Sequence, residues 1–112
     1  MNTENLSDQK CVPCEGGVDP MTIEDAEAML GFHIPDWTLS DDGKHISKKF
    51  TFKNFKEALE FVNKTGGIAE SEGHHPDIHL VGYKNVIIDL STHAIGGLSQ
   101  NDFIVAAKIN AL

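Results

Sequence analysis

The chain has 112 residues, the usual size of one domain, so we expect a single hydrophobic core and no second domain. Nine Lys and Arg against seventeen Asp and Glu give a formal net charge of −8, which opposes direct binding to nucleic acid or to anionic lipid surfaces. No run of about twenty apolar residues occurs and the N-terminus lacks a secretory-signal pattern, so we expect a cytoplasmic protein without a direct nucleic-acid or membrane partner.

The beginning of the chain is predicted to form an arm outside the domain. Residues 1–19 are polar and interrupted by glycine, so we assign them to a flexible or loosely docked arm and residues 20–112 to the domain. The arm contains a Cys-Val-Pro-Cys element, Cys11 to Cys14. Two thiols make only half of a zinc site, and a thioredoxin-like motif would need a helix where Glu-Gly-Gly follows Cys14. We therefore expect a structural or incidental role for both cysteines.

The first part of the domain predicts a helix followed by a β-hairpin. Thr22 can cap a helix over residues 23–30, with Gly31 just past its end. Strand-like segments at 37–40 and 45–52 flank an Asp-Gly turn, which is the typical hairpin signal. Alternation in the second segment places both of its phenylalanines on the face that enters the core.

A long second helix is predicted next, although two glycines interrupt its pattern. Gly66-Gly67 would each cost roughly 1 kcal/mol relative to alanine inside a helix, so the simpler prediction ends the helix before them. Helix-forming residues nevertheless follow, and only Pro76 forces the residue before it out of the α region. We therefore expect one continuous helix over residues 55–71 or 55–72, capped by Asn54.

The last part of the domain predicts a second hairpin and a third helix. Strand segments at 78–81 and 86–92 flank a Gly-Tyr-Lys-Asn turn. Ser99 and Asp102 form a capping box before a helix over residues 100–110. Alternation in the second strand directs three apolar residues to the core, namely Val86, Ile88 and Leu90.

The resulting element order is α-β-β-α-β-β-α. Two antiparallel hairpins can join into one four-stranded antiparallel sheet, with the three helices packed on one face. This is an α+β domain. Because the other sheet face and the edge strands would stay partly uncovered in so small a domain, we also expect self-association.

Four of the six histidines lie between residues 70 and 93, in the segment that joins the second helix to the end of the last strand. Imidazole has an unperturbed pKa of about 6.5, so it can donate or accept a proton near neutral pH, and the cluster indicates acid-base chemistry. If the second helix continues far enough, Glu70 and His74 share one face, so the carboxylate is expected to orient that imidazole. His75 must leave the helix before Pro76, and His93 arrives from the end of the last strand.

The same segment contains a spaced motif that reaches into the third helix. It reads Glu70-x3-His74-His75-Pro76-x6-Tyr83-x9-His93-x8-Asp102 and resembles the signature of the pterin-4a-carbinolamine dehydratase family, also named dimerisation cofactor of a homeodomain transcription factor. The resemblance covers most of the chain, and the family fold of three helices on a four-stranded antiparallel sheet agrees with the predicted order. Further similar features are the Cys-Val-Pro-Cys-Glu-Gly-Gly element, Trp37, Phe50-Thr51-Phe52 and the stretch from Gly97 to Phe103.

The resemblance implies dehydration of 4a-hydroxytetrahydrobiopterin to quinonoid dihydropterin and water, in tetrahydropterin recycling, without a cofactor or metal. Loss of water needs an acid for the departing oxygen and a base for the ring N–H proton, which two histidines can supply. The resemblance makes His74 and His93 the acid-base pair and lets His75, the third catalytic histidine, chiefly hold the small-molecule pterin. We interpret Asp102 as a helix cap. Further substrate contacts are expected from Pro76, Glu70, Trp37, Ser91 and Thr92.

Other readings of the histidine cluster stay open at this point. A zinc site is disfavoured, because the adjacent His74 and His75 should diverge and the spacing is not that of zinc enzymes. A non-catalytic pterin-binding, dimerisation or assembly role, or a role in molybdopterin metabolism, would use the same fold. We expect a homodimer or homotetramer in any of these cases.

Overall fold

The structure is a computed structural model that describes residues 6–12 and 19–112. It contains three α-helices and a four-stranded antiparallel sheet in the predicted order α-β-β-α-β-β-α, preceded by a short 3-10 helix, η1 (Leu6–Asp8). Cys14 of the Cys-Val-Pro-Cys element lies outside the described residues.

Helix α1 (Ile23–His33) begins where the sequence predicts and ends later. Oγ1 of Thr22 accepts a hydrogen bond from the backbone N–H of Asp25 at 3.1 Å, which caps the first turn. The predicted end at residue 30 was wrong, because the helix passes through Gly31. One more turn carries Ile34 into the core, where it is only 1% exposed, and that burial outweighs the weak helix propensity of one glycine.

Strands β1 (Thr38–Leu39) and β2 (Ile46–Thr51) form the predicted hairpin and are somewhat shorter than expected. Gly43 in the turn has φ +72, a conformation that glycine adopts without a steric penalty. The two phenylalanines of the second segment, Phe50 and Phe52, pack at 4.6 and 4.9 Å against the ring of Phe61. The hairpin therefore contributes to the core through the face that alternation predicts.

Helix α2 (Phe55–Glu72) is continuous through both glycines, which confirms the longer of the two predictions. Oδ1 of Asn54 caps its start by accepting from the N–H of Glu57 at 2.9 Å. The helix ends at Gly73, which takes a left-handed conformation with φ +66. The next residues are thereby turned away from the helix axis, and this change of direction positions the histidines.

Strands β3 (Asp77–Val81) and β4 (Asn85–Leu90) form the second hairpin, and α3 (Gln100–Asn110) follows a short 3-10 helix, η2 (His93–Ile95). Strand β4 ends two residues before the predicted boundary, because the chain leaves the sheet at Ser91. The bounds of α3 agree with the prediction.

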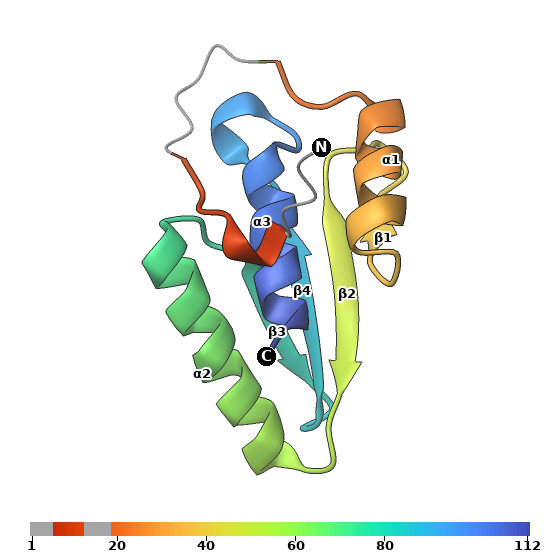
Figure 1. Ribbon diagram of the computed structural model, residues 1–112. Coiled ribbons are helices and arrows are strands. Elements are labelled where there is room, and N and C mark those ends of the chain that lie inside the picture. The colour runs from red at the N-terminus through yellow and green to blue at the C-terminus, as the bar shows by residue number, and fades with distance from the viewer. Residues whose placement is uncertain (1–5, 13–18) are drawn as a thin grey trace.

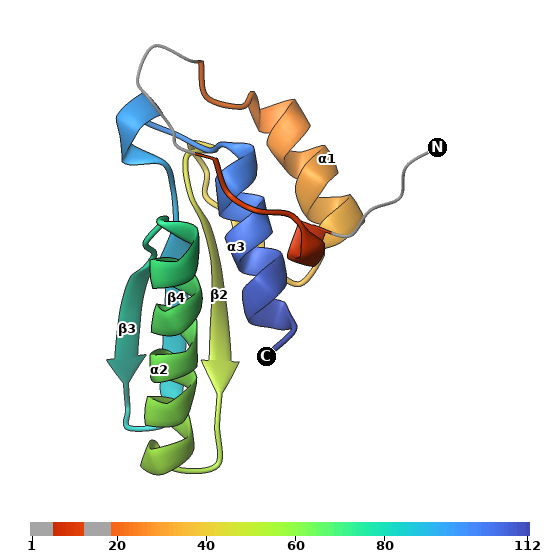
Figure 2. The ribbon, with the colours of Figure 1, turned by 60° about the vertical axis from the view of Figure 1, so that its left-hand side comes forward.

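The sheet has the order β1-β2-β4-β3, and the three α-helices lie on one of its faces (Figures 1 and 2). Helix α3 crosses the middle of this face, between α2 and α1. The predicted core residues of β4 are fully buried beneath it. The start of α3 also buries two polar side chains, Asn101 and Asp102, which is unusual unless both have partners.

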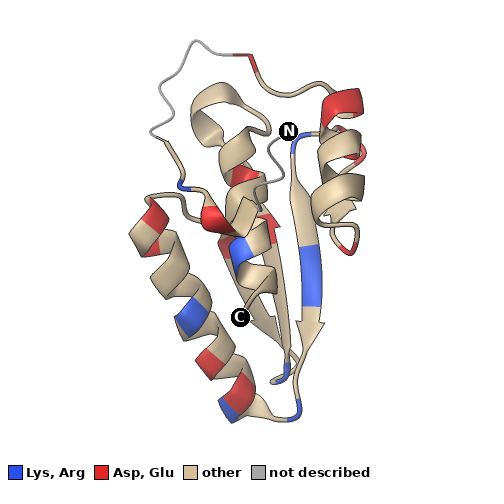
Figure 3. Cartoon of the chain, viewed as in Figure 1, with Lys and Arg blue, Asp and Glu red and all other residues tan. Residues whose placement is uncertain are grey.

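Within residues 6–12 and 19–112, no helix lies over the opposite sheet face (Figure 2). Side chains on this face include Lys49 of β2, His79 of β3 and Ile87 of β4, which are neighbours in the strand register. Lysines are spread over α2, β2 and α3, and acidic residues are frequent on α1 and near both ends of α2 (Figure 3). No helix in the described part of the chain is both long and apolar enough to cross a membrane.

Candidate active site

A cavity of about 250 Å³ lies where the end of α2, the end of β4 and the start of α3 meet. It brings together all three histidines of the spaced motif, which come from segments on either side of the β3–β4 hairpin. Its volume is slightly below the roughly 300–1,000 Å³ of pockets for drug-sized ligands, and so suits a small heterocycle. The lining residues are Val12, Gly73, His74, His75, Ser91, Thr92, His93, Ala94 and Asn101.

His74 is fixed by a buried carboxylate of α3. Its Nε2 lies 2.6 Å from Oδ1 of Asp102, whose side chain is fully buried, while the His74 side chain is 12% exposed. A carboxylate accepts hydrogen bonds, so Nε2 carries the proton that it donates to Asp102. The lone pair of the neutral ring is then on Nδ1, which is the nitrogen that can take up a proton.

Asp102 is itself held by the segment that leads into α3. Its Oδ2 accepts from Oγ1 of Thr92 at 2.8 Å and from the backbone N–H of Ser99 at 3.0 Å. The hydroxyl of Thr92 is also 2.8 Å from that of Ser99. These bonds offset the cost of burying a charge. Asp102 therefore caps α3, as predicted, and it also orients His74, which the sequence analysis did not predict.

The expected pairing of Glu70 with His74 was wrong. Oε1 of Glu70 lies 2.8 Å from Nε2 of His75, and both of these side chains are mostly exposed. The expectation assumed that the helical face of Glu70 continues to His74. The left-handed Gly73 breaks that spacing, so His74 turns toward α3 and His75 is the ring that stays near Glu70.

His93 reaches the cavity from the other side of the hairpin. It is the first residue of η2, separated from the end of β4 by two residues, and it is exposed at the cavity wall. Ser91 and Thr92 precede it, and both also line the cavity. Because Thr92 is 3% exposed and its hydroxyl is bonded to Asp102, its main contact is with the protein.

Three residues expected to touch the substrate, Glu70, Trp37 and Pro76, are not among the residues that line the cavity. Trp37 belongs to the core at 2% exposure, with its indole N–H donating to Oδ1 of Asn110 at 3.0 Å, so the structure does not support a contact between Trp37 and the pterin. Pro76 follows the histidines without lining the cavity. Tyr83 of the motif sits in the β3–β4 turn with φ +58, and His79 lies on β3, outside the cavity lining.

The arm contributes groups that the sequence analysis did not place in the site. Val12 lines the cavity and is bonded to Asn101 of α3. Burial raises the pKa of the neighbouring Cys11 thiol to about 12, with the charge of Glu72 adding to the effect. The thiol is therefore neutral near neutral pH, which suits a structural role rather than that of a nucleophile. A loosely docked arm was one of the two alternatives expected from the sequence, but no signal in its polar sequence indicates where it docks.

Comparisons with known proteins agree on one family. A family model described as "Pterin 4 alpha carbinolamine dehydratase" matches residues 19–112. A protein of Halorhodospira halophila whose name refers to the same dehydratase is 50% identical over 108 residues, covering 96% of this chain and 97% of its own length. "Pterin-4-alpha-carbinolamine dehydratase 2, mitochondrial" of Arabidopsis thaliana is 47% identical over 111 residues, with 96% of this chain and 59% of its own length covered.

Solved structures resemble the fold. A transcriptional coactivator/pterin dehydratase from Brucella melitensis superposes with a TM-score of 0.76 at 29% identity, covering 83% of this chain and 97% of that one. A pterin dehydratase-like protein described as a RuBisCO assembly factor in the alpha-carboxysome superposes with a TM-score of 0.58 at 22% identity, covering 68% and 87%. The second likeness extends to the fold alone.

Proposed function

Because this chain belongs to the pterin-4a-carbinolamine dehydratase family, we propose that it removes water from 4a-hydroxytetrahydrobiopterin by histidine acid-base catalysis, as a step of tetrahydropterin recycling. One observation carries the proposal: the adjacent His74 and His75, which precede the β3–β4 hairpin, and His93, which follows it, line a single small cavity. The rings of His74 and His75 each contact a carboxylate, which fixes the orientation of each ring.

The reaction requires two proton transfers at neighbouring atoms. The bond between the ring carbon and its hydroxyl oxygen breaks, and an acid protonates that oxygen so that it leaves as water. A base accepts the proton of the adjacent ring nitrogen, and the double bond of the quinonoid product forms between this nitrogen and the carbon. General acid-base assistance of this kind typically contributes 10² to 10⁴ in rate.

The hydrogen bonds favour His74 as the base. Asp102 accepts a hydrogen bond from the Nε2–H group of His74. Its negative charge would stabilise the positive charge that the ring acquires when Nδ1 takes up a second proton. His93, from the opposite wall, then serves as the acid. His75 has an exposed carboxylate partner, Glu70, and chiefly holds the pterin, together with the hydroxyl of Ser91 at the cavity wall.

The test is the dehydration of a 4a-hydroxytetrahydropterin, monitored by its ultraviolet absorbance. The assay uses purified folded protein and no added metal or nucleotide. We expect a rate well above that of the buffer reaction, and no change of this rate with EDTA. Folded protein that binds a pterin without accelerating the reaction would refute the proposal and favour the non-catalytic binding or assembly role. Product analysis with a molybdopterin precursor distinguishes a role in molybdopterin metabolism from one in tetrahydropterin recycling.

We also propose that the protein is a homodimer or homotetramer. In the part of the chain that the structure describes, β1 and β3 are edge strands and one sheet face has no helix over it, which leaves hydrogen-bonding groups and surface available to a second copy. Sedimentation of the purified protein tests this directly, because a monomer has a mass of 12.2 kDa.

A further inference from the structure

The described part of the arm, Leu6–Val12, is docked onto the domain rather than extended from it. Leu6 is 3% exposed and belongs to the core. At the other end, the backbone N–H of Val12 donates to Oδ1 of Asn101 at 3.0 Å, and Nδ2 of Asn101 donates to the carbonyl of Val12 at 2.6 Å. This reciprocal pair fixes the backbone of Val12 against the first turn of α3.

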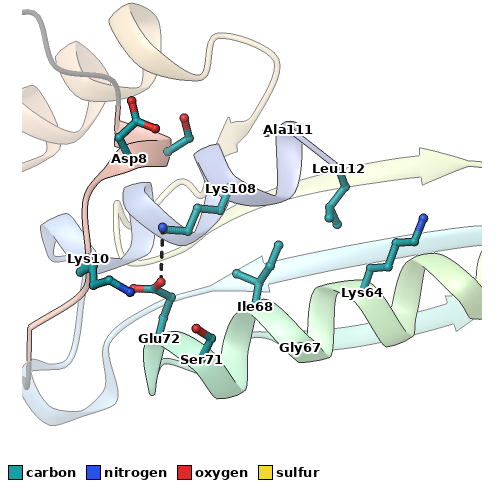
Figure 4. A pocket seen from close by; sticks show the side chains of 11 residues that line it. Asp8, Lys10, Lys64, Gly67, Ile68, Ser71, Glu72, Lys108, Ala111 and Leu112 are labelled. Atoms are coloured by element: carbon teal, nitrogen blue, oxygen red, sulfur yellow. Dashed lines mark ion pairs between the residues drawn. The ribbon is translucent and has the colours of Figure 1, made fainter.

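A charged group holds the arm one residue earlier. Oε1 of Glu72 accepts from the backbone N–H of Cys11 at 2.8 Å, and its Oε2 lies 3.3 Å from Nζ of Lys108. The Glu72 side chain is 5% exposed, and Figure 4 shows Lys10 beside the same carboxylate. The N–H of Cys11 is the main reason that the pKa of Glu72 is lowered, so the contact favours the ionised carboxylate.

The helix ends that hold the arm also hold the histidines. At the end of α2, Glu70 contacts His75 and Glu72 contacts the arm. At the start of α3, Asp102 contacts His74 while the adjacent Asn101 contacts Val12. The position of the arm relative to the rings of His74 and His75 is therefore set by the same two turns of helix that hold these two rings.

Val12 is an apolar side chain that is held in place without being buried. Its backbone is bonded on both sides, yet the residue is 68% exposed and lines the histidine cavity. Burial within the protein does not explain this side chain, whereas a bound ligand with a flat apolar face would cover it. The other lining side chains include polar histidine, serine, threonine and asparagine groups, so Val12 supplies apolar surface that a heterocycle can pack against.

We propose that the docked arm is a wall of the substrate site, in which Val12 contacts the bound pterin and Asn101 and Glu72 act as positioning residues. The inference rests on the proposed function for the identity of the ligand. A wall of this kind contacts substrate and transition state equally, so its loss raises KM and leaves kcat nearly unchanged. This effect on KM distinguishes the arm from the acid-base pair His74 and His93, whose loss lowers kcat.

The experiment compares Val12→Ala, Glu72→Ala and the double variant with wild type in the dehydration assay. Each apolar carbon covered on binding is worth a factor of about four, so Val12→Ala should raise KM about four- to fifteen-fold. Glu72→Ala removes the hydrogen-bond acceptor for the backbone N–H of Cys11 without changing a residue that lines the cavity, and it should also raise KM. If Glu72 acts through Val12, the second substitution should add little to the first. Val81→Ala, an exposed valine at the end of β3, is the matched control.

A readout besides activity keeps this test separate from that of the proposed function. Glu72→Ala should accelerate tryptic cleavage after Lys10, because the arm is released, and an oxidised pterin that binds the cavity should slow that cleavage in the wild type. Unchanged KM in Val12→Ala, with wild-type turnover intact, would overturn the inference alone. Fully multiplicative effects of the two substitutions would show that Glu72 does not act through the arm. If the wild-type protein showed no turnover in the dehydration assay, the proposed function itself would be refuted.

Discussion

The most direct test of the site is the substitution Asp102→Asn, which keeps the shape of the side chain and changes one hydrogen bond. The amide oxygen can still accept from Thr92 and from the N–H of Ser99, as Oδ2 does now. The amide nitrogen then faces Nε2 of His74, where Oδ1 stood. Because that nitrogen is a donor, Nε2 must accept, and the ring proton moves to Nδ1.

The expected loss of activity follows from this change of tautomer. If Nδ1 of His74 is the base, a proton on it blocks the transfer, and kcat should fall by about 10². An Asp-to-Asn change behind the catalytic histidine of serine proteases costs about 10⁴. The loss is smaller here, because dehydration also proceeds without catalysis and His93 remains. The free energy of unfolding should decrease by about 1.5–3 kcal/mol, the usual contribution of one hydrogen bond to a charged group.

Three measurements decide the matter: kcat from the dehydration assay, unfolding in urea, and the nitrogen chemical shifts of the His74 ring, which report the tautomer. Glu70→Gln is the matched control, because it makes the same chemical change at a carboxylate–histidine pair that is mostly exposed, and such pairs contribute about 0–1 kcal/mol. We expect less than about a two-fold change in kcat there. A folded Asp102→Asn variant with wild-type kcat and a protonated Nδ1 would refute the role of His74 as the base.

Further predictions concern the other histidines, helix stability, pH and assembly. His74→Ala and His93→Ala should each lower kcat by about 10² or less, and the double variant should be nearly inactive in the same assay. Gly66→Ala should raise the free energy of unfolding by roughly 0.5–1 kcal/mol in urea titrations, because it lies inside α2 and no atom lies within 4 Å of an added Cβ. Glu72 has a lowered pKa in the folded protein, so its charge stabilises the fold above pH 4.5 and that contribution is lost as the pH falls further. The difference in unfolding free energy between wild type and Glu72→Gln should therefore shrink between about pH 6 and pH 3. Sedimentation at micromolar concentration should give a mass at least twice 12.2 kDa.

Each of these predictions has a control variant or an outcome that would contradict it. His79→Ala removes a histidine outside the cavity lining and should leave kcat unchanged. If it lowered kcat as much as His74→Ala does, His79 would have to be counted among the residues of the site. Gly73→Ala also meets no atom within 4 Å, but its φ of +66 should make alanine destabilising, in contrast to Gly66→Ala. A Glu72→Gln difference that stays constant with pH would contradict the lowered pKa. A single 12.2 kDa species would contradict the oligomer.

The sequence by itself determined the elements and most of the residues of the cavity. Hydrophobic alternation selected the buried side of β4, and capping residues located the starts of the helices, because both depend on neighbours within one turn or one strand. The continuity of α2 through Gly66 was also predictable, since no residue before Pro76 forbids the helical conformation. The spaced motif selected the three histidines, although their convergence on one cavity needed the fold.

Only the tertiary structure decided which groups hold the histidines. Helical spacing paired Glu70 with His74, but Gly73 in a left-handed conformation redirected that ring to Asp102, 28 residues later in the chain. Trp37 was expected near the substrate, and its partner Asn110 lies 73 residues away. The contact of Val12 with Asn101 spans 89 residues and leaves no periodic trace in a polar arm. Helix caps and strand alternation can be predicted from the sequence because they depend on neighbouring residues. The contacts named here join distant residues and form only once the sheet and helices are packed.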